Sequence, residues 1–225
     1  MATIHKTTMT PGKVELLRNW LPGQPWYQGG EPPELRRGGG FRLDDPAGEV
    51  GIEFSVVIDR SGGPAVAYLI PLTYRSAALP GADDALIGTA VHGVLGDRWI
   101  YDGTRDPVLV AALVALIQGN AEPQAAGVSD TPDPTVVSRP ATSEPITVIA
   151  PAAVTDSVAA TELWLGVQRA DGSAAGQLFV LVHRVLQADA TPADQDNLPG
   201  VSGTWQLPDE TQGRGTFITA EYTSG

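Results

Sequence analysis

Short apolar segments broken by turn-forming residues run through most of this 225-residue chain. In Glu49–Asp59, apolar residues alternate with polar or small ones, which places one apolar set on a single side of an extended strand. Turn chemistry precedes this segment at residues 45–48 and follows it at residues 61–64, and Val66–Arg75 supplies the next apolar run. Strands that follow one another through such short turns pair antiparallel, so the pattern predicts an antiparallel sheet.

The strand-turn-strand pattern recurs along the rest of the chain. It predicts hairpins of residues 89–94 with 97–101, of 161–169 with 177–186 through Asp171-Gly172, and of 201–207 with 215–222. Single strands are predicted at residues 2–9, 34–44 and 146–150. Pro71 lies inside its strand, and because proline cannot donate to a ladder, we expect an edge strand or a bulge there.

Two helices are predicted from their terminal residues. Thr10 and Pro11 are typical of an N-cap and first helical position, and Pro22 requires this helix to end by Leu21. Asp106-Pro107 opens a second helix that runs to about residue 118, before Gly119. Its residues are apolar on nearly every side, so we expect it to be covered by other elements.

These elements define an α+β fold: a curved antiparallel β-sheet with two main helices, followed by a β-rich C-terminal part. We divide the chain into a domain at residues 1–120, a linker or long surface loop at 121–145, and the β-rich part at 146–225. The middle segment is rich in Ala, Pro, Ser, Thr and Asp and buries little surface. The C-terminal strands either form their own domain or continue the first sheet.

An aromatic elbow follows the first helix, at residues 20–30. Two prolines stop the helix there, and two tryptophans and a tyrosine fall within eight residues. Trp26 and Tyr27 are candidates for binding a sugar or a partner, as are Trp99 and Tyr101 on one side of a later strand. Core packing is the alternative for all four, because aromatic side chains dominate the packing of protein interiors. Trp26 follows Pro25 in a loop and is expected to be the most exposed.

The composition excludes several classes of function. A net charge of −12 argues against nucleic acid and anionic membranes as partners, since both attract clustered cations. The absence of cysteine removes disulfides and thiolate metal sites, and no spacing of histidines or acids indicates a metal or a cofactor. Residues 1–6 contain no apolar signal region, and no apolar run is long enough to span a bilayer. We therefore expect a cytoplasmic protein.

Acidic residues around the turn at 45–48 allow two interpretations. Asp44 and Asp45 with Glu49 and Glu53 could supply the carboxylate pair that glycoside hydrolysis requires. Aspartate is also favoured in turns because its side chain accepts hydrogen bonds from nearby backbone, and we prefer this second interpretation. Gly38-Gly39-Gly40 has no following lysine or helix start, so it is a poor phosphate loop.

The elbow residues 19–27, Asn-Trp-Leu-Pro-Gly-Gln-Pro-Trp-Tyr, resemble the entry motif of the N-terminal cap domain of actinobacterial maltokinases. Residues 70–75, 87–89 and 99–103 extend this similarity over about residues 14–118. The chain is similar to free-standing actinobacterial proteins called maltokinase N-terminal cap-like, some of which are labelled 1,4-α-glucan branching proteins. The resemblance implies a curved antiparallel sheet with helices, a domain that is not itself the catalytic part of a kinase.

The residues that a kinase uses for phosphoryl transfer are missing from this sequence. No histidine starts a His-Gly-Asp-type catalytic loop, and no lysine follows Lys13 to pair with phosphates. No nucleophile motif of the Gly-x-Ser-x-Gly type is present either. We therefore expect a non-catalytic binding or interaction module linked to maltose, trehalose or glycogen metabolism, with no catalytic residues. The alternatives are a small α-glucan-acting enzyme and a subunit that caps a separately encoded sugar kinase.

Overall fold

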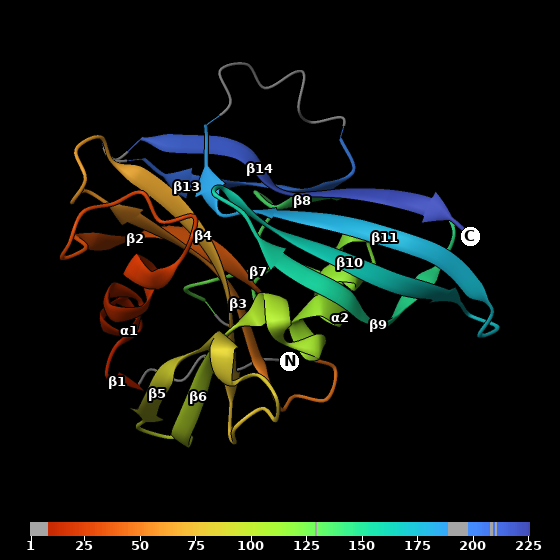
Figure 1. Ribbon diagram of the computed structural model, residues 1–225, viewed down its shortest axis with the longest axis horizontal. Coiled ribbons are helices and arrows are strands. Elements are labelled where there is room, and N and C mark those ends of the chain that lie inside the picture. The colour runs from red at the N-terminus through yellow and green to blue at the C-terminus, as the bar shows by residue number, and fades with distance from the viewer. Residues whose placement is uncertain (1–8, 129, 189–197, 208, 210) are drawn as a thin grey trace.

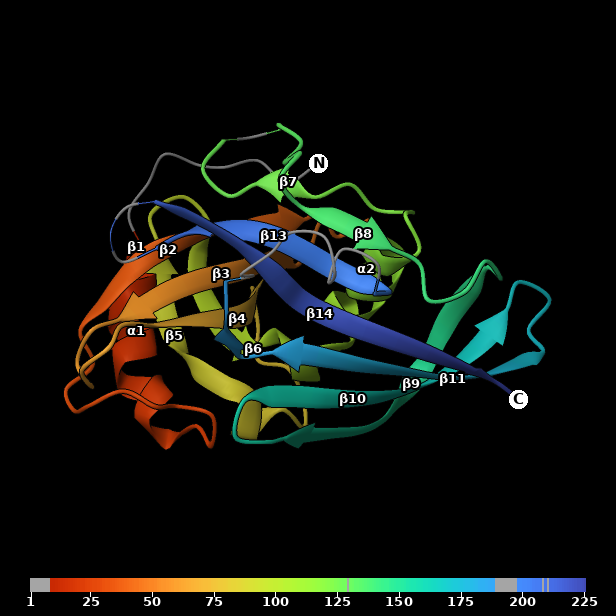
Figure 2. The same ribbon diagram turned by 90° about the horizontal axis from the view of Figure 1, so that it is seen from above.

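Two curled antiparallel β-sheets pack against each other and enclose most of the hydrophobic core (Figures 1 and 2). The computed structural model describes residues 9–128, 130–188, 198–207, 209 and 211–225. In this part of the chain the helices are α1 (Lys13–Trp20), α2 (Pro107–Ile117) and the short 3-10 turns η1 (Leu21–Gly23), η2 (Asp83–Ala85) and η3 (Gly103–Arg105). The α+β prediction is roughly consistent with this, although strands dominate.

The first sheet has eight strands in the order β1-β5-β6-β4-β3-β2-β7, with β12 pairing separately to β4. Its strands are β1 (Met9–Thr10), β2 (Leu35–Leu43), β3 (Gly51–Asp59), β4 (Val66–Arg75), β5 (Leu86–His92), β6 (Gly96–Asp102), β7 (Gln124–Ala125) and β12 (Val185–Leu186). Every pairing is antiparallel, which confirms the pattern-based prediction. The predicted strand at residues 2–9 lies outside the described residues except for Met9.

The second sheet has six strands in the order β8-β13-β14-β11-β10-β9. They are β8 (Val137–Arg139), β9 (Ile146–Asp156), β10 (Ala160–Arg169), β11 (Ala174–His183), β13 (Gly200–Gln206) and β14 (Gln212–Ser224). The hairpins predicted around Gly172 and around residues 207–211 are confirmed. β7 and β8 lie within the segment predicted as a linker, and the division into domains stays a prediction.

The first sheet is covered on both faces. One face carries Phe41, Phe54 and Val56, which join the main core, whereas Val57 and Tyr68 on the other face pack with α1 and the elbow. The prediction that the apolar residues of Glu49–Asp59 share one side of a strand is therefore confirmed, because that side faces the main core. The opposite face of β3 is buried as well, because α1 and the residues after it cover it.

Aromatic rings connect the two sheets through the core. Phe41 of β2 stacks on Phe54 with ring centroids 4.6 Å apart, and lies 6.2 Å from Phe217 of β14. β2 passes close to β13 at Gly39, where a Cβ would be in ordinary van der Waals contact, 3.8 Å, with the Cα of Trp205. Leu113 and the other inward residues of α2 belong to the same core, so α2 closes the space between the sheets.

β4 is an internal strand, which corrects the edge strand or bulge predicted from Pro71. Its pairing with β3 shows no register shift. On the other side, β12 pairs with residues 67–68 and β6 pairs with residues 72–75. Pro71 falls between these two partners, where the ladder needs no N–H donor.

The start predicted for the first helix is wrong. Thr10 is held extended by antiparallel pairing with Val91 of β5, so it does not cap the helix. α1 begins at Lys13 behind Gly12, which has extended backbone and makes no side-chain cap hydrogen bond. The predicted end is confirmed, because Pro22 lies in η1 directly after α1. The second helix is confirmed at both ends, with Asp106 as N-cap and Gly119 at a φ of +75°.

Substitution of Gly40 should destabilise the protein far more than substitution of Gly48. Both have positive φ, +119° and +71°, but a Cβ on Gly40 would lie 2.0 Å from the carbonyl oxygen of Phe54, whereas Gly48 has nothing within 4 Å. We expect Gly40→Ala to cost about 3 kcal/mol or more and Gly48→Ala about 1–2 kcal/mol, which chemical denaturation measures. Equal losses would contradict the close approach of Gly40 to the carbonyl oxygen of Phe54.

Candidate functional site

The aromatic elbow is part of the core. Trp26 is 0% exposed, so the expectation that it is the exposed member is wrong. Its ring lies 5.7 Å from that of Trp20 and 5.8 Å from that of Tyr68 on β4. The loop after Pro25 turns inward because the face of the first sheet offers apolar surface that α1 alone does not cover. A binding role for Trp26 stays a prediction, and the residue offers no surface in this structure.

Tyr27 fixes the elbow to the end of β3. Its hydroxyl lies 2.7 Å from Oδ2 of Asp59 and 2.6 Å from the carbonyl oxygen of Gly30. Burial and the Asp59 carboxylate raise the pKa of Tyr27 to about 12, so the phenol stays protonated. Gly29 is required beside it, because a Cβ there would lie 1.9 Å from Asp59 Oδ2. These contacts are those of a structural anchor.

Trp99 and Tyr101 lie on β6 in a separate, smaller cluster. Tyr101 is buried, and its hydroxyl accepts a hydrogen bond of 2.8 Å from the backbone N–H of Leu79. Trp99 is half-buried against the same cluster. The structure therefore does not bring the four predicted aromatic residues together, and only Tyr27 and Trp99 retain partial exposure.

The acidic residues near the 45–48 turn act structurally. Asp45 accepts hydrogen bonds from the backbone N–H groups of Ala47, Glu49 and Val50, at 2.9–3.0 Å. Glu53 pairs with Lys13 and accepts from the Tyr74 hydroxyl at 2.8 Å. Burial opposes ionisation of Glu53, but Lys13 and Tyr74 outweigh it and lower its pKa. This confirms turn formation as the role of Asp45.

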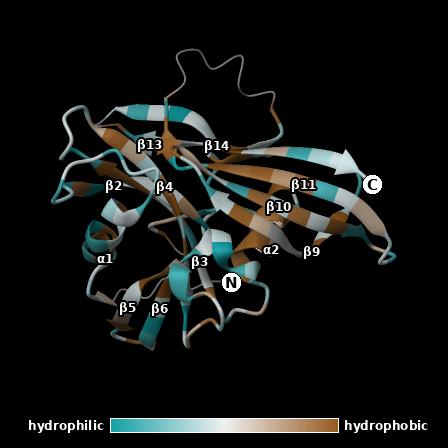
Figure 3. Cartoon of the chain, viewed as in Figure 1, coloured by the Kyte–Doolittle hydropathy of each residue, from teal (hydrophilic) through white to brown (hydrophobic). Residues whose placement is uncertain are grey.

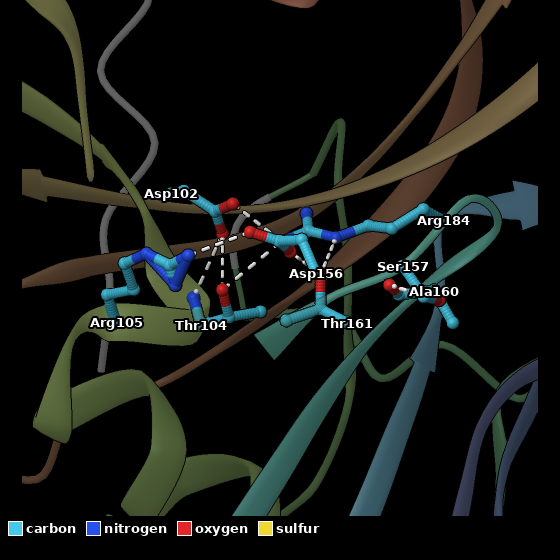
Figure 4. Close-up of polar contacts among 8 residues, drawn as sticks. All are labelled: Asp102, Thr104, Arg105, Asp156, Ser157, Ala160, Thr161 and Arg184. Atoms are coloured by element: carbon cyan, nitrogen blue, oxygen red, sulfur yellow. Dashed lines mark hydrogen bonds and ion pairs between the residues drawn. The ribbon is translucent and has the colours of Figure 1, made fainter. Parts of the chain in front are cut away.

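A buried arginine joins the two sheets (Figure 4). Arg184, 0% exposed, lies between β11 and β12. Its Nη2 donates to Asp102 Oδ2 at 2.5 Å and to Thr104 Oγ1 at 3.1 Å, at the end of β6 and in η3. Its Nε donates to Thr161 Oγ1 on β10 at 2.6 Å, and its guanidinium lies 5.0 Å from the centroid of the Trp26 ring. One side chain thus contacts both sheets and the elbow.

The network continues from Thr161 to the surface of the second sheet. The Thr161 hydroxyl donates to Asp156 Oδ1 at 2.5 Å, and Arg105 Nη2 donates to Asp156 Oδ2 at 2.7 Å. Figure 4 shows Arg105 and Arg184 on opposite sides of this chain of contacts. Arg105 belongs to η3, the turn that leads into α2, so the network fixes where α2 begins.

Asp106 adds a second ion pair at the same point. Both oxygens of its carboxylate accept from Arg75, at 2.6 Å each, and Oδ1 also accepts from the backbone N–H of Val108. Burial opposes ionisation, but the Arg75 guanidinium and the Val108 N–H outweigh it and lower the pKa of Asp106. The start of α2 is therefore held by charged groups from β4, which carries Arg75, and from β9, which carries Asp156.

A groove of about 710 Å³ runs along the outer side of α2. Its apolar lining includes Val108, Ala111 and Ala115 of the helix, and Ala111 is exposed. The turn after β2 and the segment before β7 form its walls, with the polar residues Asp44, Asn120, Glu122 and Gln124. α2 contains no charged residue, and Figure 3 shows it mostly at the hydrophobic end of the scale. The groove suits apolar side chains of a partner.

Local sequence patterns indicated neither the role of Arg184 nor the groove. Arg184 lies near the end of the strand predicted at residues 177–186, and nothing local indicates that its partners lie 82 and 23 residues away. The absence of charge from α2 was a signal for the groove. The sequence pattern did not, however, distinguish the exposed alanines on the outer side of the helix from its buried residues. Neither helix is long and apolar enough to cross a membrane, and no group of three histidine, aspartate or glutamate side chains could hold a metal ion in the described part of the chain.

The protein consists mainly of β-strands, and one helix without charged residues, α2, packs between its two sheets. Residues 20–106 match the maltokinase N-terminal cap domain family, so this part of the chain is similar to that domain, which confirms the resemblance of the elbow motif. The match extends from Trp20 in the elbow to Asp106, the N-cap of α2. No curated protein sequence matches the chain.

Replacement of Arg184 should be among the costliest substitutions in the protein. We expect Arg184→Leu to lower the free energy of unfolding by about 3–5 kcal/mol, because Asp102 is left buried without its cation. Arg139→Leu, at an exposed arginine, should change it by less than about 0.5 kcal/mol. The double variant Arg184→Leu/Asp102→Asn should lose less than the two single variants together, and simple additivity in chemical denaturation would disprove the coupling.

Asp106 should contribute a pH-dependent part of the stability. Its folded pKa lies below the unfolded value of about 3.9, so the contribution is complete above about pH 5 and is lost as pH falls through the folded pKa. We expect Asp106→Asn to be less stable by about 1–2 kcal/mol at pH 7, with the difference from the unsubstituted protein shrinking below about pH 4. A difference that stays constant from pH 7 to pH 3 would refute this assignment.

Proposed function

We propose that this protein is a non-catalytic interaction module in maltose and α-glucan metabolism, and that it binds a partner protein through the groove along α2. The observation that carries the proposal is the match of residues 20–106 to the maltokinase cap domain. A cap domain is by its name an accessory to a sugar kinase. The partner we propose is therefore a sugar kinase or another enzyme of α-glucan metabolism.

The state of the acidic residues supports a non-catalytic role. Glycoside chemistry requires a carboxyl group with a raised pKa as general acid beside a second carboxylate. Where the pKa of a described carboxyl group is shifted, it is shifted downward, as for Glu53, Asp59 and Asp106. Asp45, Glu53, Asp102 and Asp106 are each engaged by backbone N–H groups or by a cation.

The groove supports docking of a protein. The start of α2 is held by the Arg75–Asp106 pair and by η3, so its outer face is presented on a rigid support. Interfaces have apolar centres and polar rims, and the alanines of α2 flanked by Asp44, Asn120 and Glu122 have this arrangement. The acidic rim and the net charge of −12 favour a partner surface that carries cations around its apolar residues.

Placing an arginine in the groove should abolish partner binding without unfolding the protein. We expect Ala111→Arg to reduce capture of a sugar kinase or α-glucan enzyme from the native cytosol by at least about tenfold, because a long charged side chain fills the groove centre. Ala111 is exposed and arginine is a good helix former, so the circular dichroism spectrum should not change. Quantitative pull-down with purified bait measures the effect.

The matched control is Ala170→Arg, at an exposed alanine in the turn between β10 and β11. This variant should capture the partner as well as the unsubstituted protein does. Capture that is insensitive to Ala111→Arg would refute the groove as the docking site. Turnover of maltosaccharides by the purified protein alone would instead refute the non-catalytic role and favour a small α-glucan-acting enzyme.

A further inference from the structure

A tryptophan is exposed on the outer face of the second sheet. Trp164 of β10 is 42% exposed, and its ring lies 4.6 Å from that of Phe179 of β11, at an angle of 47°. The two residues are direct cross-strand partners. The neighbouring Leu163 and Leu165 are buried in the core, so the side chain of Trp164 lies on the opposite, outer face of the sheet.

Hydrogen-bonding groups flank the aromatic pair on both sides. The register places Glu221 of β14 opposite Phe179, which continues the row across three strands. The adjacent rows contain Glu162 and Thr219 on one side and Gly166, Gln177 and Thr223 on the other. Gly166 leaves space beside Trp164 because it has no side chain. The result is an aromatic surface with carboxylate and amide groups at its margin.

A hollow of about 430 Å³ adjoins the pair where Phe179 meets β14. It is lined by Phe179, Thr219, Glu221 and Tyr222, with Ala141, Leu198, Pro199 and Ala220. The aromatic pair therefore lies directly beside the hollow, and Phe179 and Glu221 belong to both. A ligand that covers Trp164 can place a second unit in the hollow.

The charges select the kind of ligand. The three rows include two carboxylates, Glu162 and Glu221, and no lysine or arginine among their described residues. Phosphates, nucleic acid and other anions are disfavoured by this charge. A glucose ring in its chair form has C–H groups on both faces and hydroxyl groups around its edge. The C–H groups suit the negative face of an aromatic ring, and the hydroxyl groups donate to carboxylate and amide oxygens.

We propose that Trp164, Phe179 and Glu221 form a binding site for a glucose oligosaccharide, with one sugar ring on Trp164 and the next units along Phe179 toward Glu221. The choice of glucose units rests on the proposed link to α-glucan metabolism. The site itself lies on β10, β11 and β14, outside the residues that match the cap domain family and away from those that line the α2 groove. The protein would thus hold a glucan chain and a partner protein on separate surfaces.

Isothermal titration of the full chain with maltoheptaose tests this site. We expect saturable binding that Trp164→Ala weakens by at least about tenfold, the loss typical for removal of an aromatic contact. Trp164→Tyr should retain part of the affinity because it keeps an aromatic face. Glu221→Gln should weaken binding less than Trp164→Ala does, since an amide oxygen still accepts hydrogen bonds from sugar hydroxyl groups.

Two control variants separate this proposal from the docking groove. Val94→Ala, at a residue that is 62% exposed near the β5–β6 turn, should bind maltoheptaose normally. Ala111→Arg should also bind it normally while losing the partner protein. Absence of maltoheptaose binding, or binding that survives Trp164→Ala, would overturn the sugar site. Loss of partner capture in Trp164→Ala without any sugar binding would assign the surface to a protein instead. Thermal melting of each variant confirms that the fold persists.

Discussion

The contacts of Arg184 determine how the two sheets of this protein are joined. Burying an arginine is costly unless its donors are paired. Here Nη2 of Arg184 is paired with Asp102 and Thr104 of the first half of the chain, and Nε is paired with Thr161 of the second. The backbone at the same residue also connects the sheets, because its N–H donates to Ala159 and its carbonyl accepts from Leu69. Charge and backbone therefore specify one relative position of β4, β6 and β10.

That position has consequences for α2. The helix has almost no polar surface of its own, so its placement depends on residues at its start. Asp106 caps it and pairs with Arg75, and Arg105 reaches Asp156 on the second sheet. Because these charged contacts lie before the first turn, the remaining turns are free to pack their apolar side chains inward. The outer alanines are left as the accessible side.

Local sequence signals predicted much of the fold but little of the site. Asp171-Gly172 and Asp106-Pro107 specify a hairpin and a helix start by their own backbone preferences, and both are where they were expected. Thr10 and Trp26 were misjudged because pairing with β5 and the uncovered face of β4 override local preference. Trp164 could have been recognised, since it alternates with buried Leu163 and Leu165 on the side that also carries Glu162. The partners of Arg184 are distant in sequence, and no local pattern indicates them.

The return of the chain to the first sheet after β11 affects how the protein folds. β12 adds to β4 across more than half of the chain, and Arg184 reaches Asp102 from 82 residues away. Contacts with such long sequence separation form slowly, because a large loop must close before they contribute. During synthesis, the strands of the first sheet therefore emerge from the ribosome before Arg184 is available to pair with Asp102 and before β12 can pair with β4. Completion of the sheet has to wait until residues 184–186 have been translated.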